Sequence, residues 1–234
     1  MRILIYEPNS LIRDGLITVF IVAGYEIVIV RDKRLILSML GKRPFVVAIL
    51  DVVNDDEDMM NILRTIHSDV RYNNVKVMAH ILDPTKESMS EMLKIGVFAF
   101  LFKPFIEKDF LSRFELILQK NNLMPKRKCH TVINNINLSL SFRNDETRQM
   151  LNARVVELST ISMRFVPGYE NTSISVGNTI NNASLSVAGT NVQLSVTVVG
   201  KDGPEYIANI TDITSFNMKL LCKIIYDKYI ELLK

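Results

Sequence analysis

The chain has 234 residues, of which 48% are hydrophobic and 23% are charged, and its formal net charge is +3. This composition is typical of a soluble globular protein, and the length suffices for two domains of ordinary size or one large one. No apolar run approaches the roughly 20 residues that cross a bilayer, and the first residues enter a strand pattern without a signal-peptide cleavage region. We therefore expect a cytoplasmic protein without membrane insertion. The small net charge does not by itself indicate nucleic-acid binding.

The cysteines and histidines give no sign of a structural metal site. Cys129 and Cys222 are far apart in the sequence, so we expect free thiols rather than a disulfide or a redox pair. His67, His80 and His130 have no ligand-like spacing to each other or to the cysteines. A structural zinc site is therefore not expected.

Strand and helix patterns alternate through residues 1–120. The expected strands are Ile3–Tyr6, Glu26–Val30, Val46–Asp51, Val75–Ala79 and Val97–Phe102. The expected helices run from Asn9 or Ser10 to Gly24, from about Lys33 to a stop at Gly41, over Met59–Ile66, over Thr85–Ile95 and over about Glu107–Gln119. Strict alternation predicts a doubly wound, five-stranded parallel sheet with right-handed crossovers, an α/β fold.

The stretch Val46–Asp51 is predicted to form the central strand of this half. Its unbroken apolar run is typical of a strand buried on both faces, and Asp51 follows at the carboxyl end. Open α/β sheets bind ligands at that edge, where Glu7 and Lys103 should also lie because they follow the first and fifth strands. The alternatives are ordinary ones: Asp51 as a turn or cap residue, Glu7 as a solvated acid and Lys103 as a surface lysine.

Three segments of this half carry a resemblance to a known family. They are ILIYEPNSLIRDGL near the start, AILDVV around Asp51 and AFLFKPF around Lys103. Residues 1–120 resemble the receiver domain of bacterial two-component response regulators, which has a flavodoxin-like fold. The resemblance implies that Asp51 accepts a phosphoryl group from a histidine kinase or phosphotransfer protein, and that Lys103 pairs with that group.

The same resemblance implies further roles. Mg²⁺ would lie between Glu7, Asp51 and the backbone carbonyl of Val53. Phe100 would be the aromatic residue that switches position on phosphorylation. The family also has a cis peptide bond at the position of Lys103–Pro104.

Two positions depart from the family pattern. The family has a pair of acids after the first strand, whereas this chain has Glu7 followed by Pro8. The family ends its fourth strand with threonine or serine, whereas this chain has Ala79, and the neighbouring His80 does not replace that hydroxyl. The alternative is therefore a non-phosphorylated pseudo-receiver that serves as a scaffold, adaptor or dimerisation module.

Residues 121–128 read as a linker because they are polar, contain Pro125 and end in a run of bases. Beyond it, residues 129–234 alternate with the period of strands. Strands are expected around Val132–Phe142, Ala153–Ser159, Ser162–Val166, Val192–Val198 and Tyr206–Ile210, with short edge strands within 171–191 and a helix from about Ser215. The pattern predicts a small antiparallel β-barrel closed by a C-terminal helix. We do not expect this chain to be an enzyme, since it lacks phosphate-loop, G-x-S-x-G and H-E-x-x-H motifs.

Two motifs suggest what the barrel could bind. Arg127–Thr131 partly matches an R-x-x-x-R entrance motif, and Glu157–Ser162 keeps the serine of a [DN]-x-S-x-x-G motif. With these motifs the second half resembles a degenerate PilZ domain, the cyclic di-GMP sensor of bacteria. The resemblance implies Lys126, Arg127 and Ser159 as ligand-binding residues. The alternative interpretation of the basic run is a solvated linker.

These features together predict a response regulator of a phosphorelay, whose receiver controls a PilZ-like output by contact with a downstream protein. A homodimer is possible within this scheme. A DNA-binding transcription regulator is a further alternative, although no helix-turn-helix pair follows the linker.

Overall fold

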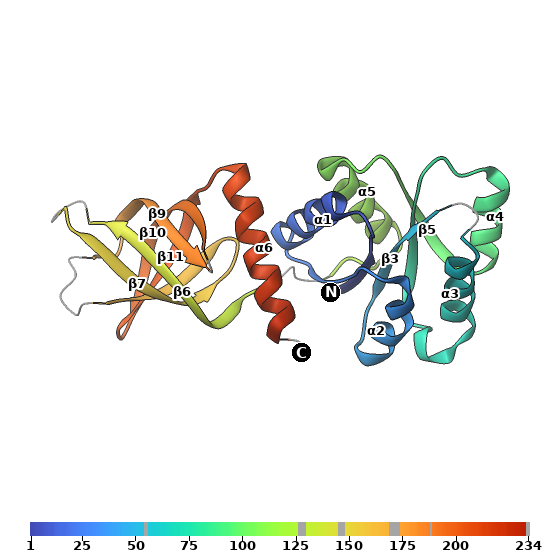
Figure 1. Cartoon of the computed structure of the whole chain (residues 1–234), viewed down its shortest axis with the longest axis horizontal. Helices are drawn as coiled ribbons and strands as arrows, with labels where there is room; N and C mark the ends of the chain where they lie inside the picture. Colours follow the sequence, from blue (N-terminus) through green and yellow to red (C-terminus); the bar gives the residue numbers. More distant parts are fainter. Residues whose placement is uncertain (54–55, 126–129, 145–147, 169–173, 188, 233–234) are drawn as a thin grey trace. The chain divides into compact units, whose positions relative to one another are not determined.

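The computed structural model describes all residues except 54–55, 126–129, 145–147, 169–173, 188 and 233–234, and it leaves the side chains of 135–137 undescribed. The chain separates into two compact units, Met1–Cys129 and His130–Lys234. Figure 1 shows that the first is an α/β unit and the second a β-rich unit.

The first unit is a five-stranded parallel sheet in the order β2-β1-β3-β4-β5. Its strands are β1 (Arg2–Tyr6), β2 (Glu26–Val30), β3 (Val47–Val52), β4 (Lys76–Ile81) and β5 (Val97–Phe102). Its helices are α1 (Ser10–Val22), α2 (Ile36–Lys42), α3 (Glu57–Ser68), α4 (Lys86–Lys94) and α5 (Glu107–Lys120), with short 3₁₀ turns at Lys33–Leu35 and Val70–Tyr72. The predicted doubly wound fold is confirmed.

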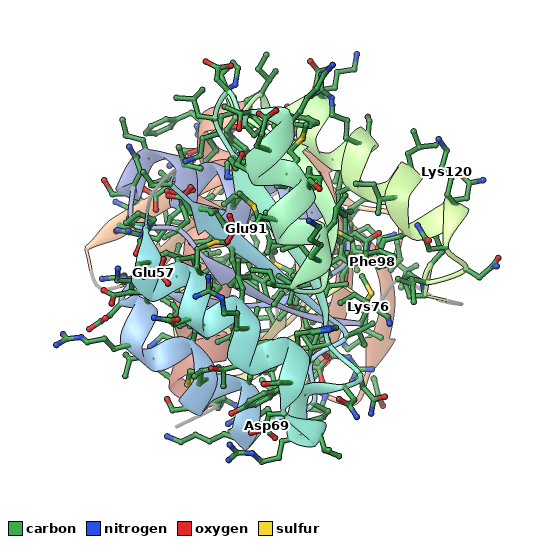
Figure 2. The ribbon with its side chains drawn as sticks, turned by 90° about the vertical axis from the view of Figure 1, so that its right-hand side faces the viewer. Glu57, Asp69, Lys76, Glu91, Phe98 and Lys120 are labelled. Atoms are coloured by element: carbon green, nitrogen blue, oxygen red, sulfur yellow. The ribbon has the colours of Figure 1, made fainter. Side chains whose placement is uncertain are left out.

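Helices cover both faces of this sheet (Figure 1). Helices α1 and α5 pack together on one face, where Phe20, Tyr25, Phe110 and Phe114 form edge-to-face contacts with ring centroids 5.0–6.0 Å apart. Figure 2 looks onto α3 and α4 and shows Lys76 beside Phe98, whose ring centroid lies 5.8 Å from the Lys76 ammonium. Because helices cover both faces of the sheet, strand β3 is buried along its whole length, as its apolar run predicts.

Local signals set most helix ends. Asn9 caps α1 by accepting from the Leu11 and Ile12 amides, and Gly24 follows the helix with a φ of 77°. The prediction for the second helix is corrected at both ends, because residues 33–35 form a 3₁₀ turn and α2 continues through Gly41 to Lys42. Gly41 does not adopt a positive φ and so does not stop the helix.

The second unit is a closed antiparallel barrel in the order β10-β11-β8-β7-β6-β9, followed by a helix. Its elements are β6 (Ile133–Arg143), β7 (Met150–Leu158), β8 (Ser162–Pro167), β9 (Thr179–Val187), β10 (Thr190–Asp202), β11 (Glu205–Asp212) and α6 (Ser215–Leu232). The predicted barrel with a C-terminal helix is confirmed.

One prediction about the barrel is wrong. In place of short edge strands within residues 171–191, β9 is a single nine-residue strand that pairs with both β6 and β10. Its inward side carries Ile180, Ala183 and Leu185, which are buried. Closure of the barrel pairs both sides of β9, so its polar outward residues mark a solvent-facing surface rather than a sheet edge.

Helix α6 packs against β6 and β10 of its own barrel. Its buried residues are Leu221, Cys222, Ile224, Ile225 and Tyr226. Cys222 is a free thiol, as predicted, and burial raises its pKa to about 12. Among the described residues, no helix is both long and apolar enough to cross a membrane.

Candidate functional site

Three neighbouring strands bring three polar residues into one row at the carboxyl edge of the parallel sheet. Asp51 on β3 is the register partner of His80 on β4. Glu7 follows Tyr6, which pairs with Leu50, so Glu7 lies at the same level as Asp51. All three are buried, with exposed fractions of 1% for Glu7, 5% for Asp51 and 1% for His80.

Glu7 is held by the turn that starts α1. Its Oε1 accepts from the Asn9 amide at 2.9 Å, while Asn9 in turn caps the helix. Its Oε2 lies 3.5 Å from Nδ1 of His80 and has no hydrogen-bond partner within the described part of the chain. The turn thus fixes one carboxylate oxygen and leaves the other directed toward His80.

Asp51 pairs with the Lys103 ammonium through its Oδ1. Lys103 directly follows β5, its amide donates to the Ile81 carbonyl at 2.9 Å, and the Lys103–Pro104 peptide bond is cis, as the sequence resemblance implied. Burial raises the pKa of Asp51 and the Glu7 carboxylate adds to the rise, while Lys103 and His80 act in the opposite direction. Lys103 therefore offsets only part of the cost of burying this carboxylate.

Glu7, Asp51 and His80 could together hold a metal ion, since one ligand atom from each lies within 4.8 Å of the others. The predicted ligand set was Glu7, Asp51 and the carbonyl of Val53. Val53 follows β3, its side chain is exposed, and its carbonyl accepts from the Asp56 amide at 3.3 Å. Its role as a ligand stays a prediction. His80 is the member of the cluster that sequence reasoning did not include.

The described acids of the loop after β3 are engaged elsewhere. Lys33 contacts Asp56 at 2.8 Å and Asp58 at 2.9 Å, and Asp56 also caps α3 by accepting from the Met59 amide. These carboxylates raise the pKa of Lys33 to about 12. The negative charge beside the sheet edge is therefore partly neutralised by Lys33 and does not add to the buried cluster.

The residues of the predicted switch lie side by side on β4 and β5. Ala79 pairs with Phe100 and is fully buried. Phe100 is half-buried and stacks on Phe102, with ring centroids 6.4 Å apart and planes at 24°. The neighbouring His80 packs its ring edge-to-face against Phe110 at 5.4 Å. The aromatic position is occupied, and the small side chain opposite it offers no hydroxyl.

Of the three candidate ligand residues of the barrel, the structure describes Ser159. Lys126 and Arg127 lie outside the described residues. Ser159 is 2% exposed, and its Oγ accepts from the Ser162 amide at 3.0 Å and the Ile161 amide at 3.3 Å in the turn between β7 and β8. The Ser159 hydroxyl therefore stabilises this turn, and a role in cyclic di-GMP binding stays a prediction.

A pocket of about 470 Å³ opens at the other end of the parallel sheet. Its walls include His67, Tyr72, Lys76 and Phe98, the last two of which are labelled in Figure 2. Lys76 begins β4, so this pocket lies at the amino edge, away from Asp51. Its lining residues, taken from the described chain, contain no carboxylate to act with the histidine.

Comparisons with known proteins find likenesses only among solved structures, since no family model and no curated protein match the chain. A CheY-like receiver domain protein from Methanospirillum hungatei is 22% identical, with 52% of this chain and 95% of that chain covered and a TM-score of 0.46. The chemotaxis protein CheY4 of Vibrio cholerae is 22% identical, with 50% and 98% covered and a TM-score of 0.46.

A likeness for the second unit comes from the PilZ domain of YcgR from Escherichia coli, whose structure contains c-di-GMP. It is 12% identical, with 43% of this chain and 90% of that chain covered and a TM-score of 0.39. The fold assignment depends on the strand order described above.

Proposed function

We propose that the chain is a signal-transduction response regulator in which Asp51 accepts a phosphoryl group and the PilZ-like barrel delivers the output by protein contact. The observation that carries this proposal is the position of Asp51: buried at the carboxyl edge, paired with Lys103 and beside the Glu7 carboxylate. A nucleophilic carboxylate, a fixed ammonium and a cation site are the parts that phosphoryl transfer needs.

The phosphoryl donor would be a phosphohistidine of a histidine kinase or phosphotransfer protein. A carboxylate oxygen of Asp51 attacks the phosphorus, the P–N bond to the donor imidazole breaks as the P–O bond forms, and the leaving imidazole takes up a proton. Lys103 neutralises charge on the phosphoryl oxygens. Mg²⁺, when bound by Glu7 and Asp51, would supply further positive charge to the same oxygens.

The raised pKa of Asp51 bears on this reaction, because only the ionised carboxylate is a nucleophile. As the pH falls through the raised pKa, the ionised fraction decreases and the transfer slows. Lys103 counteracts this loss by favouring the ionised form. The site thus depends on its lysine both before and during transfer.

The output differs from a hydroxyl-based switch. Ala79 cannot hydrogen-bond a phosphoryl oxygen, and Phe100 is already half-buried against Phe102. The group that must move on phosphorylation is Lys103, because its partner changes from a carboxylate oxygen to the phosphoryl group. Lys103 also begins the segment between β5 and α5, so we assign the first step of the response to this segment.

Cyclic di-GMP is the small-molecule ligand that the fold of the second unit and the basic run Lys126–Lys128 suggest for the output. Titration calorimetry of the full chain with cyclic di-GMP tests this part. Binding that is lost in Arg127→Ala would support it, and the absence of heat would leave protein contact, with a downstream protein or a second copy, as the output.

The central step is tested by incubating the full chain with phosphoramidate and Mg²⁺ and measuring intact mass. We expect one phosphoryl adduct on the wild type and none on Asp51→Asn. Asp58→Asn is the matched control, because Asp58 is an exposed acid of the same region and should leave the adduct unchanged. An adduct that persists in Asp51→Asn, or no adduct on the wild type, would overturn the assignment and favour a pseudo-receiver scaffold.

A further inference from the structure

We propose that His80 is a metal ligand, and that the Glu7–Asp51–His80 cluster binds a first-row divalent transition ion such as Mn²⁺ in preference to Mg²⁺. This inference rests on the proposed function in that it names the ion used by the same site, but it is tested by metal binding alone. It starts from a residue that the phosphoryl-transfer scheme does not use.

The first observation is that the strand register brings the histidine into the site. Asp51 and His80 are direct partners across β3 and β4, and Glu7 lies at the same level on the other side of Asp51. The three ligand atoms lie within 4.8 Å of one another. One ion could contact all three after small side-chain rotations, since metal–ligand distances are about 2.0–2.2 Å.

The second observation is unsatisfied hydrogen-bonding capacity in the buried cluster. Glu7 Oε2 has no hydrogen-bond partner among the described residues, and it is directed at His80 Nδ1 across 3.5 Å. Both residues are 1% exposed, so bulk water does not solvate their side chains. A buried, unpaired carboxylate oxygen carries a large free-energy penalty unless a cation compensates it.

Two cations could meet this need: a proton on His80, giving a buried ion pair with Glu7, or a metal ion between them. The local charge favours the metal ion. Glu7 and Asp51 carry two negative charges, Lys103 already pairs with Asp51, and a divalent ion would contact both carboxylates at once. A protonated imidazole would instead contact only the Glu7 carboxylate, across 3.5 Å.

The donor set determines which ion is preferred. Mg²⁺ selects oxygen ligands and holds its water, whereas imidazole is a good ligand for transition metals. Two carboxylates and one imidazole form a mixed set in which the nitrogen adds affinity for Mn²⁺ and heavier ions, with little gain for Mg²⁺.

The test is calorimetric titration of the full chain with Mn²⁺ and, separately, with Mg²⁺, for the wild type and His80→Asn. We expect His80→Asn to weaken Mn²⁺ binding by at least about tenfold, since even loss of an outer-shell partner of a metal ligand has an effect of this size. Mg²⁺ binding should be unchanged or tighter because the amide supplies an oxygen. His67→Asn is the matched control, since His67 is an exposed histidine of the same unit. Its titrations should match the wild type.

A second readout detects the nitrogen directly. Pulsed electron paramagnetic resonance of bound Mn²⁺ should show coupling to an imidazole nitrogen in the wild type and His67→Asn, and none in His80→Asn. If His80→Asn fails to fold, Glu7→Gln tests the same site, and we expect weaker binding of both ions with the nitrogen coupling retained. Equal Mn²⁺ affinity in wild type and His80→Asn, or no nitrogen coupling in the wild type, would overturn the inference.

Failure of this inference is distinguishable from failure of the proposed function. If His80 is not a ligand but the wild type still forms a phosphoryl adduct on Asp51 with Mg²⁺, only the metal preference is wrong. If Mn²⁺ binds through His80 but Asp51 accepts no phosphoryl group with either ion, the site is a metal site without phosphoryl transfer.

Discussion

The two units differ in how their buried polar side chains are hydrogen-bonded. In the α/β unit, Glu7 Oε2 and His80 Nε2 are buried without hydrogen-bond partners in the described chain. In the barrel, Ser159 is equally buried, but its hydroxyl is fully engaged by the turn between β7 and β8. Burial of a polar residue is therefore a weak sign of function by itself. Unsatisfied ionisable side chains that cluster at a sheet edge are the stronger sign.

Thr131 of the barrel sharpens this distinction. Its Oγ1 is also buried without a partner among the described residues. It is a neutral hydroxyl, however, and it is not part of the candidate metal-binding cluster found among the described residues, which consists of Glu7, Asp51 and His80. An isolated neutral group costs less than an unpaired carboxylate, so the structure can retain it without a ligand.

The largest expected effect on stability comes from Lys103→Met. The substitution keeps an apolar stem but leaves Asp51 buried beside Glu7 without its ammonium, which should lower the free energy of unfolding by about 3 kcal/mol at pH 7. Urea titrations at pH 7 and at successively lower pH measure it, and the loss should shrink as the pH falls and Asp51 takes up a proton. A loss that does not depend on pH would show that packing, rather than the charge pair, is responsible.

The matched change in the barrel is Arg164→Met. Arg164 pairs with Glu157 and Glu205 at 3.3 Å, but its side chain and that of Glu157 are 35% and 37% exposed. Solvent screens such pairs, so we expect a loss below about 1 kcal/mol. An effect as large as that of Lys103→Met would remove the contrast between the two units.

Ser159→Ala should have the second-largest effect on stability, between those of Lys103→Met and Arg164→Met. It removes the acceptor of the Ile161 and Ser162 amides and should lower the stability of the barrel by about 1–2 kcal/mol, measured by thermal unfolding. Phosphorylation of Asp51 should be unchanged. If Ser159→Ala abolished cyclic di-GMP binding without lowering the unfolding temperature, the residue would be a ligand contact and the turn role assigned here would be wrong.

Ala79→Ser should have a smaller effect on stability and a specific effect on switching. A hydroxyl at this fully buried position costs about 1 kcal/mol if unpaired, but it restores a group able to bind a phosphoryl oxygen next to Phe100. We expect the Phe100 ring resonances to move with beryllofluoride in Ala79→Ser and to stay in place in the wild type. Movement of Phe100 in the wild type would show that the hydroxyl is dispensable.

The smallest expected effect is the pH dependence of stability due to Asp51. Its folded-state pKa is raised, so the folded protein binds more protons than the unfolded chain between the ordinary carboxyl pKa and the raised value. The contribution of Asp51 to stability is therefore greatest at low pH and declines as pH rises through that window. Comparison of unfolding midpoints of the wild type and Asp51→Asn over this range measures it, and an opposite slope would mean that Lys103 dominates.

The residues of the site that directly follow apolar strand segments could be predicted from the sequence. Glu7, Asp51 and Lys103 each come at the end of an apolar run, and parallel strands end at one edge, so their meeting could be anticipated. His80 was missed because β4 was expected to end at Ala79, whereas it continues to Ile81. The register of β3 against β4, which no single-strand pattern contains, is what pairs His80 with Asp51.

The barrel shows a different limit of sequence patterns. Its alternation and closing helix were predictable, but β9 was expected as short edge strands because its outward residues are polar. Whether a polar strand lies at an edge or inside a closed barrel depends on long-range pairing with β6 and β10. Likewise, only the turn geometry shows that the Ser159 hydroxyl accepts hydrogen bonds from the Ile161 and Ser162 amides.

The most direct measurement of the central claim is beryllofluoride binding to the full chain, followed by fluorine NMR with Mg²⁺ or Mn²⁺ present. We predict a bound signal for the wild type and none for Asp51→Ala, which would show that Asp51 is a live phosphoryl acceptor supported by Glu7 and Lys103. If neither protein gives a bound signal with either ion, the site does not accept a phosphoryl group, and the first unit is a scaffold.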